Sequence, residues 1–128
     1  MEPLIINFCP TGMVPTKADN PNVPISPSEI IEQTHQAYEI GITIVHIHAR
    51  DEDQRPTHEA RVYRQIIEGI QKHCPRLLIS ASASGRNVKD FNKRSEVIEL
   101  QPDLCSLTLS SLNFVRWLLL ISPAFLIS

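Results

Sequence analysis

The chain has 128 residues, the size of one domain and well below the roughly 250 residues of a complete enzyme barrel. Twelve basic and fourteen acidic side chains leave a net charge of −2, which excludes the strongly basic surface that favours nucleic acid as a partner. Hydrophobic residues make up 42% of the chain, enough to build a buried core.

The N-terminus and the cysteines indicate where the protein works. MEPLIINFCP has no basic region ahead of its apolar residues, so we expect no signal peptide. Cys9, Cys74 and Cys105 form no C-x-x-C pair, and an odd number of cysteines fits free thiols in a reducing compartment. We therefore expect a cytoplasmic protein with no membrane partner.

The first elements in chain order are a strand, a loop and a helix. Residues 4–9 are nearly all apolar, which predicts a strand covered on both faces, and Pro10 to Gly12 end it. Residues 13–24 contain three prolines and no apolar period, so they form a loop. Ser26, Pro27 and Glu29 mark the start of a helix that runs to about residue 40.

The strand predicted at residues 42–48 carries the most informative pattern in the chain. Alternate side chains of a strand share a face, so His46 and His48 lie on the same side, with Cα atoms roughly 6.6 Å apart. Two imidazoles at this separation are able to converge on one metal ion. Arg50 and Asp51 follow, and the polar run DEDQRPT predicts the loop that leaves the strand. Arg50 is either a solvated or ion-paired residue at the strand end or an electrostatic part of the site.

The second half continues the alternation of helices and strands. An apolar stripe predicts a helix at about 58–73, and further apolar runs predict strands at 77–82 and 104–109 with a weaker helix at 88–100 between them. Residues 82–85, Ser-Ala-Ser-Gly, form a tight turn whose backbone N–H groups are able to approach an anionic ligand. His58 and His73 flank the 58–73 helix, where capping explains them, and His35 is an ordinary mid-helix residue. Cys9 is more simply a small core residue than a part of the site.

The order β-α-β-α-β-α-β predicts an α/β fold with a parallel sheet and right-handed crossovers. Polar residues gather where all four strands end, and the active sites of (β/α)₈ TIM barrels lie at that edge. No glycine-rich dinucleotide motif follows the first strand, so we expect the first half of a barrel, truncated, rather than a doubly wound sheet.

From residue 115 onward the sequence changes character. VRWLLLISPAFLIS carries one charge, follows neither period, and is too short to cross a bilayer, which needs about 20 residues. We expect residues 1–114 to be a partial barrel domain and residues 115–128 to be a divergent tail from mis-splicing or a shifted reading frame.

Three stretches carry a family resemblance: PTGMVPTKADNPNVPISPSEI, GITIVHIHARDEDQRPTHEARVYRQIIEGI and QPDLCSLTLSSLNF. They resemble the β-keto acid cleavage enzymes, whose type member is the 3-keto-5-aminohexanoate cleavage enzyme. The resemblance runs over residues 1–114 and covers only the first half of the family's length. Its most specific parts are the H-x-H-x-R at residues 46–50 and the Asn-Phe pair at residues 113–114.

The resemblance implies a (β/α)₈ barrel that binds Zn²⁺ and exchanges acyl groups between a β-keto acid and acetyl-CoA, giving acetoacetate and a new acyl-CoA. His46 and His48 resemble two zinc ligands of the family. The third ligand, a glutamate, and the catalytic acid and arginine lie in the half that this chain lacks, so its catalytic residues are unknown. A full-length form is implied to be a homo-oligomer.

The substrate-binding residues are likewise implied by the resemblance. Ser82, Gly85 and Ser106 fall where family members contact the keto acid. Thr108 stands where the type member has an asparagine, and Val14 stands where it has an acid that meets the substrate's ammonium group. We therefore expect an uncharged or apolar substrate tail.

Two other functions remain open. Metal-dependent hydrolases of the amidohydrolase kind also carry H-x-H on a barrel strand, but on the first strand, whereas here a full β-α unit precedes it. Alternatively, the chain is a truncated product without catalytic activity. Four strands of a closed barrel leave two unpaired edges, and such edges favour association.

Overall fold

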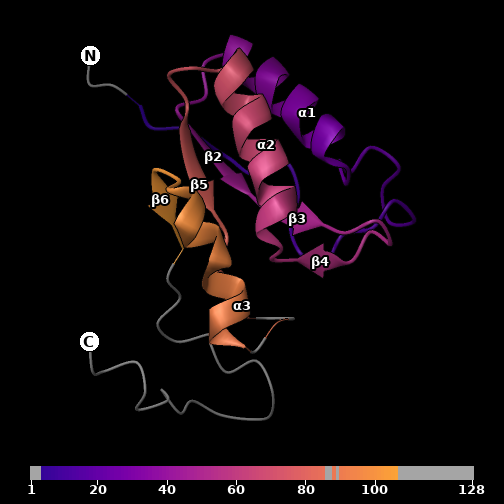
Figure 1. The fold of residues 1–128 in the computed structure, drawn as a ribbon. Coiled ribbons are helices and arrows are strands. Elements are labelled where there is room, and N and C mark those ends of the chain that lie inside the picture. Colours follow the sequence, from indigo (N-terminus) through magenta and orange to yellow (C-terminus); the bar gives the residue numbers. More distant parts are fainter. Residues whose placement is uncertain (1–3, 86–87, 89, 107–128) are drawn as a thin grey trace.

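The computed structural model describes residues 4–85, 88 and 90–106 (Figure 1). In chain order the elements are β1 (Asn7–Phe8), α1 (Pro27–Glu39), β2 (Ile44–Ile47), β3 (Ala49–Arg50), β4 (Pro56–Thr57), α2 (Ala60–His73), β5 (Leu78–Ala81), α3 (Phe91–Ser95), a 3₁₀ helix η1 (Glu96–Leu100) and β6 (Leu104–Cys105). No helix among these residues is both long and apolar enough to cross a bilayer.

Four strands form one parallel sheet in the order β1-β2-β5-β6. The sequence therefore predicted the α/β class and the parallel pairing correctly. α1 and α2 lie side by side over the sheet (Figure 1), and η1 packs against α2. Because the strands are parallel, their carboxyl ends meet at one edge of the sheet, as a shared site requires.

The core lies between the sheet and the helices. Val45, Ile47 and Ile79 of the two central strands are at most 1% exposed, as are Ile30 of α1 and Ile66 of α2. Alternate strand residues therefore face the helices, and the intervening ones face the opposite side of the sheet.

The two long helices approach each other closely. A Cβ atom added to Gly69 of α2 would meet the side chain of Ile31 of α1. The small residue at this position lets the two helices pack tightly above the sheet.

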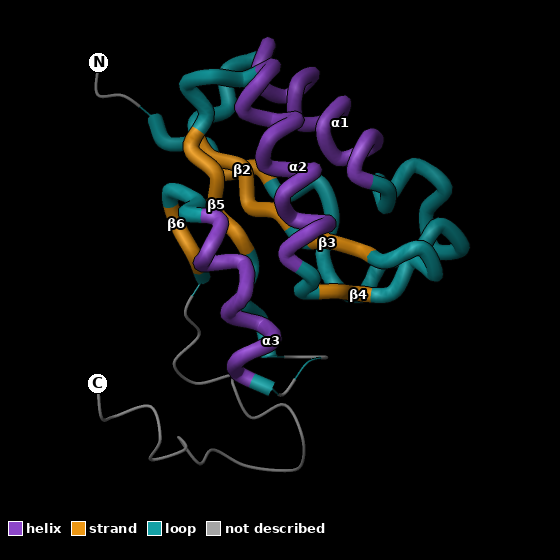
Figure 2. Tube along the Cα trace, viewed as in Figure 1, coloured by secondary structure: helices purple, strands orange, loops and turns teal. Residues whose placement is uncertain are grey.

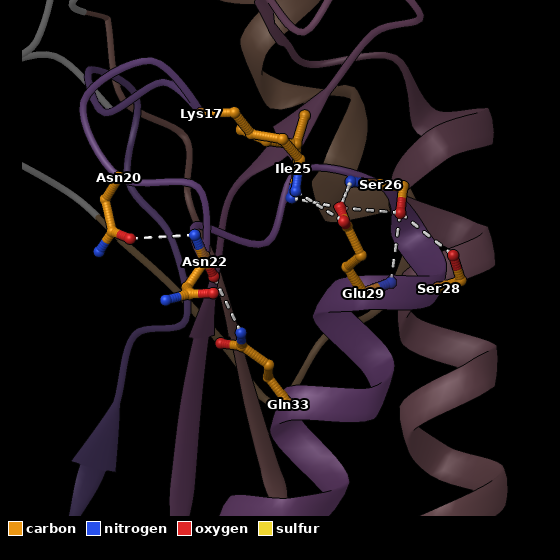
Figure 3. Close-up of polar contacts among 8 residues, drawn as sticks. All are labelled: Lys17, Asn20, Asn22, Ile25, Ser26, Ser28, Glu29 and Gln33. Atoms are coloured by element: carbon orange, nitrogen blue, oxygen red, sulfur yellow. Dashed lines mark hydrogen bonds and ion pairs between the residues drawn. The ribbon is translucent and has the colours of Figure 1, made fainter.

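Helix α1 begins as the sequence predicts. The backbone N–H of Glu29 donates to Ser26 Oγ, and Glu29 Oε2 accepts from the N–H groups of Ser26 and Ile25 (Figure 3). This capping box satisfies donors that a helix start otherwise leaves without partners. At the other end, Gly41 has φ of +104°, a conformation that favours glycine.

The first strand is shorter and more exposed than the sequence predicts. β1 covers only Asn7–Phe8, and the side chains of Leu4 and Ile5 are 76% and 72% exposed. The expectation of a strand covered on both faces was wrong, because β1 is at the edge of the sheet and pairs only with β2 among the described residues.

Two further segments differ from the prediction. The loop after β2 contains a small antiparallel ladder, in which β3 pairs with β4 (Figure 2). The helix expected at 88–100 is a five-residue α3, capped by Asp90, followed by η1, which ends at Gln101 in a left-handed conformation. Helix α2 starts at Ala60, two residues later than predicted. Thr108, the end of the 104–109 strand, the Asn-Phe pair at 113–114 and the 115–128 tail lie outside the described residues.

Candidate functional site

The two histidines of the H-x-H motif lie together on the side of the sheet opposite the helices. Val45, Ile47 and Ala49 are buried in the core, whereas His46 and His48 are partly exposed. The centroids of the two imidazole rings are 5.0 Å apart, and the ring planes are nearly perpendicular at 82°. The predicted pairing of the two rings on one side of β2 is therefore present.

Ser80 of the neighbouring strand orients His46. The two residues are paired in register across β2 and β5, and a hydrogen bond of 2.9 Å joins His46 Nδ1 to Ser80 Oγ. If Nδ1 donates, the proton is on Nδ1 and Nε2 presents a lone pair. Burial lowers the pKa of His46, which favours the neutral ring that binds a metal.

The arrangement fits a metal half-site. Nitrogen atoms are ordinary zinc ligands at about 2.0–2.1 Å, and a second residue that fixes the tautomer of a ligating histidine is usual. The described residues contain no group of three or more histidine, cysteine or acidic side chains able to hold a metal ion. The described residues therefore present two neighbouring imidazoles, fewer than the three protein ligands of a catalytic zinc site.

The turn after β5 brings two of the predicted substrate residues together. Ser82 is 1% exposed; its Oγ accepts from the N–H of Ser84 at 3.3 Å. Ser106 Oγ accepts from the N–H of Ala83 at 3.1 Å, so the segment after β6 reaches the same turn. Gly85 is buried at its end. Ser82, Gly85 and Ser106 therefore cluster at the carboxyl edge.

The same turn is tied to β2 and to α2. The N–H of Ser82 donates to the carbonyl of Ile47 at 3.1 Å, which places the turn next to His48. The hydroxyl of Tyr63, itself 1% exposed, donates to the carbonyl of Ser82 at 3.1 Å. Burial raises the pKa of Tyr63, so the hydroxyl keeps its proton and stays a donor. This backbone is consequently held from two sides.

The loop after β1 carries Val14, which is 62% exposed. β1 neighbours β2, so this loop leaves the sheet at the edge where the histidines lie.

Cys9 is exposed, and the expectation of a core residue was wrong, because the backbone there is at the sheet edge.

Arg50 is buried, at 4% exposure, rather than solvated or paired with an acid. Its guanidinium donates to three backbone carbonyls, those of Gly12, Pro15 and Gln54. The solvated interpretation of this residue was therefore wrong. Three carbonyl oxygens therefore satisfy the two Nη atoms of Arg50, whereas its buried Nε has no hydrogen-bond partner among the described residues.

The prediction that His58 caps the start of helix α2 was also wrong. It is 4% exposed, and Glu59 holds the N-cap position of α2. Burial and then nearby Arg94 lower the pKa of His58, while the carbonyl of Ser84 and Glu96 act in the opposite direction. His58 is thus a buried neighbour of the 82–85 turn.

Ser80 and Tyr63 contribute to the site and were missed by the sequence reasoning, which named Arg50 but not its partners. Strand parity offered a signal for Ser80, because residues 80 and 82 share a face that the register matches to His46. No local signal indicated that Arg50 contacts the carbonyls of Gly12 and Pro15, which lie 38 and 35 residues away in the chain.

Comparison with known proteins gives a family match and several related sequences. The family model described as beta-keto acid cleavage enzyme matches residues 3–126. The 3-oxoadipate:acetyl-CoA acetyltransferase of Cupriavidus necator is 41% identical over 113 residues, which are 88% of this chain and 39% of that protein. The 3-keto-5-aminohexanoate cleavage enzyme of Fusobacterium nucleatum is 35% identical over 114 residues, which are 89% of this chain and 42% of that protein.

A solved structure, the ternary complex of ObcA with C4-CoA adduct and oxalate, shares the fold with a TM-score of 0.63 at 22% identity. The match covers 70% of this chain and 24% of that one. The chain thus spans about two fifths of the length of the curated relatives it matches. On the match across residues 3–126, the chain belongs to the beta-keto acid cleavage enzyme family.

Proposed function

We propose that this chain forms the zinc-binding part of an enzyme that cleaves a β-keto acid with acetyl-CoA, giving acetoacetate and an acyl-CoA. The observation that carries the proposal is the pair of imidazoles on one face of β2, with His46 held by Ser80. The relatives named for acetyl-CoA-dependent transfer and keto-acid cleavage support the reaction class.

His46 and His48 would hold the metal, and Zn²⁺ would supply Lewis-acid stabilisation of the charge that develops on the keto oxygen. Ser80 fixes the ring of His46 before any ligand arrives. We expect the third ligand, the catalytic acid and the arginine to come from sequence that corresponds to the part of the relatives not matched by this chain.

The 82–85 turn and Ser106 would bind the carboxylate of the keto acid. Ser106 Oγ and Ser82 Oγ already meet backbone N–H groups of this turn, and the Tyr63 hydroxyl holds it from behind. Thr108 belongs to the same proposal from the sequence alone. The N–H groups of Ala83 and Ser84 already donate to the two serine oxygens, so the serine hydroxyls would be the groups that donate to the carboxylate.

Val14 would face the substrate's tail. An exposed valine contributes neither a charge nor a hydrogen bond, so an aliphatic or uncharged tail fits there better than an ammonium group. A complete form of the enzyme should therefore prefer keto acids without an amino substituent.

The fold proposal is a truncated (β/α)₈ barrel over residues 1–114, followed by a divergent tail. Its support is the cover of α1, α2 and η1 on one side of the parallel sheet, which leaves the histidine face open as the inside of a barrel would be. The three free thiols Cys9, Cys74 and Cys105 suit a cytoplasmic setting. A complete form would assemble as a homo-oligomer.

A second candidate is a non-catalytic product. It is favoured by the absence of a three-ligand cluster among the described residues and by the share of the relatives' length that the chain spans. The open edges at β1 and β6 of the described sheet would then serve association rather than catalysis.

Zinc titration of the purified chain tests the metal part of the proposal. We expect the chain to bind one Zn²⁺ ion, and we expect His46→Ala and His48→Ala each to abolish this binding. The matched control is His35→Ala, because His35 lies on α1 and its ring contacts His73 rather than the H-x-H pair. Equal zinc binding in all four proteins would contradict the assignment.

Acetyl-CoA-dependent consumption of a β-keto acid tests the reaction. We expect turnover from any longer product of the gene, and its loss in His46→Ala. Turnover that is insensitive to both histidine substitutions would refute the proposed role of the pair. Activity confined to the long form, with the 128-residue chain neither active nor able to bind zinc, would favour the non-catalytic candidate for this chain.

A further inference from the structure

The loop between β1 and α1 is held at two separate places. Its far part, residues 16–24, is fastened to α1: Lys17 Nζ contacts Glu29 Oε1 at 2.7 Å, and Gln33 Nε2 donates to the carbonyl of Asn22 at 3.1 Å (Figure 3). The Asp19 carboxylate closes the tip by accepting from Thr16. None of these contacts reaches residues 12–15, where Val14 lies.

The near part of the loop is held by Arg50. Its Nη2 donates to the carbonyls of Gly12 and Pro15, the latter at 2.9 Å, so one nitrogen spans the two residues that bracket Val14. Its Nη1 donates to the carbonyl of Gln54 at 3.0 Å, on the turn between β3 and β4. One guanidinium thus joins the loop after β1 to the hairpin after β2.

Arg50 is rigidly connected to the histidine pair. It lies two residues after His48, and the β3–β4 ladder pairs it with Pro56. The hairpin turn is itself closed by Asp51, whose N–H donates to the carbonyl of Arg55 at 2.8 Å and whose Oδ1 accepts from the N–H of Arg55 at 2.8 Å. A displacement of the loop relative to Arg50 is therefore a displacement relative to the H-x-H strand.

The shape of the guanidinium explains why arginine occupies this position. Its planar fork presents several donors in fixed directions, whereas a lysine ammonium is a single point on a flexible stem. Three carbonyls that belong to two different loops require donors that diverge. The buried position also removes competing water, which strengthens each contact.

We propose that Arg50 is a positioning residue that fixes residues 12–15, and with them Val14, at a set distance from the H-x-H strand. This inference rests on the proposed function only for its consequence, which is discrimination between substrate tails. The hydrogen bonds from Arg50 to residues 12–15 are a property of this chain, and their role is testable without turnover. Arg50 touches neither a metal ligand nor the 82–85 turn through any of its hydrogen bonds.

The first test removes the guanidinium of Arg50 and measures how the loop changes. In Arg50→Ala, trypsin should cleave after Lys17 on the order of tenfold faster, because the protease must draw residues 13–17 into its cleft and Gly12 and Pro15 are then no longer held by Arg50. This factor corresponds to one net charge-assisted hydrogen bond. The amide NMR signals of Gly12 to Val14 should move, while those of α2 stay in place. The matched control is Arg55→Ala, because Arg55 is in the same hairpin and its side chain is 75% exposed.

Chemical rescue separates positioning from general destabilisation. Guanidinium at about 10 mM, far below the molar concentrations that unfold proteins, should restore the slow cleavage and the amide signals of Arg50→Ala, and NaCl should not. Arg50→Lys should recover less than half of the protection, since one ammonium does not reach carbonyls of both loops. If Arg50→Ala does not fold, Arg50→Met keeps the buried stem and is read in the same way.

The outcomes decide the proposal without ambiguity. Unchanged cleavage after Lys17 and unchanged amide signals in a folded Arg50 variant would overturn it, as would equal effects in Arg55→Ala. Where the protein turns over keto acids, Arg50→Ala should raise KM for the keto acid more than it lowers kcat and reduce selectivity between apolar and aminated tails. Absence of turnover from every longer product of the gene would contradict the proposed function, while the cleavage and NMR results would still test the role of Arg50.

Discussion

Glu29 should make the stability of this protein depend on pH in the acid range. Its carboxylate accepts hydrogen bonds from the N–H groups of Ile25 and Ser26 and pairs with Lys17. Lys17 first, and then the backbone of Ser26 and Ile25, lower its pKa from 4.5 to about 2. Because the folded pKa is depressed, the stabilisation is complete above pH 4.5 and is lost as the pH falls towards 2.

The magnitude follows from this change after allowance for solvent. The full fall in pKa, at about 1.4 kcal/mol for each pH unit, sets an upper bound of roughly 3 kcal/mol. Glu29 and Lys17 are 41% and 37% exposed, so water screens the pair. We therefore expect the carboxylate to contribute about 1 kcal/mol near neutral pH, typical of a helix cap or an exposed pair.

Urea unfolding of the native chain and of Glu29→Gln, followed by circular dichroism from pH 7 to pH 2.5, measures this contribution. The variant should be less stable by about 1 kcal/mol at pH 7, which lowers Tm by about 4 °C for a domain of this size. The difference should shrink as the pH falls below 4.5 and should be largely lost by pH 2.5, where the folded pKa of about 2 still leaves part of the carboxylate ionised. Glu32→Gln is the control, since Glu32 lies on the same helix and accepts a hydrogen bond from the exposed Gln36 side chain. A difference between the native chain and Glu29→Gln that is the same at both ends of the pH range would refute the reasoning.

Three further substitutions have definite expected outcomes. Tyr63→Phe removes the buried hydroxyl that donates to the carbonyl of Ser82, and urea unfolding should show a loss of about 1 kcal/mol. Gly41→Ala places a Cβ where φ is +104° and no atom lies within 4 Å, so the loss of about 1–2 kcal/mol in thermal unfolding should come from backbone strain alone. Ser80→Ala removes the partner of His46 Nδ1 and should weaken zinc binding by about tenfold or more in calorimetric titration, and unchanged affinity would show that the serine does not orient the ring.

Local sequence signals predicted the features that depend on near neighbours. The start of α1 at Pro27 follows from Ser26, Pro27 and Glu29, which act within one turn of helix. The shared face of His46 and His48 follows from the two-residue period of a strand. Neither requires knowledge of any distant residue.

Features that depend on distant partners escaped prediction. The charge of Arg50 indicated an exposed side chain, but the side chain is buried and carbonyls of another loop accept from its Nη2. His58 is buried against elements that only the fold brings together. The β3–β4 ladder consists of two-residue strands, which are too short to show a period, and its turn uses Gln54 with φ of +64° rather than a glycine.

The bond between His46 and Ser80 has a consequence for biosynthesis. The two residues are 34 positions apart and belong to one strand-helix-strand unit, β2-α2-β5. The orientation of this imidazole is thus encoded within a contiguous stretch that leaves the ribosome before β6 does. No residue after β5 takes part in this hydrogen bond, so polypeptide synthesised later adds to an imidazole whose partner already belongs to the same unit.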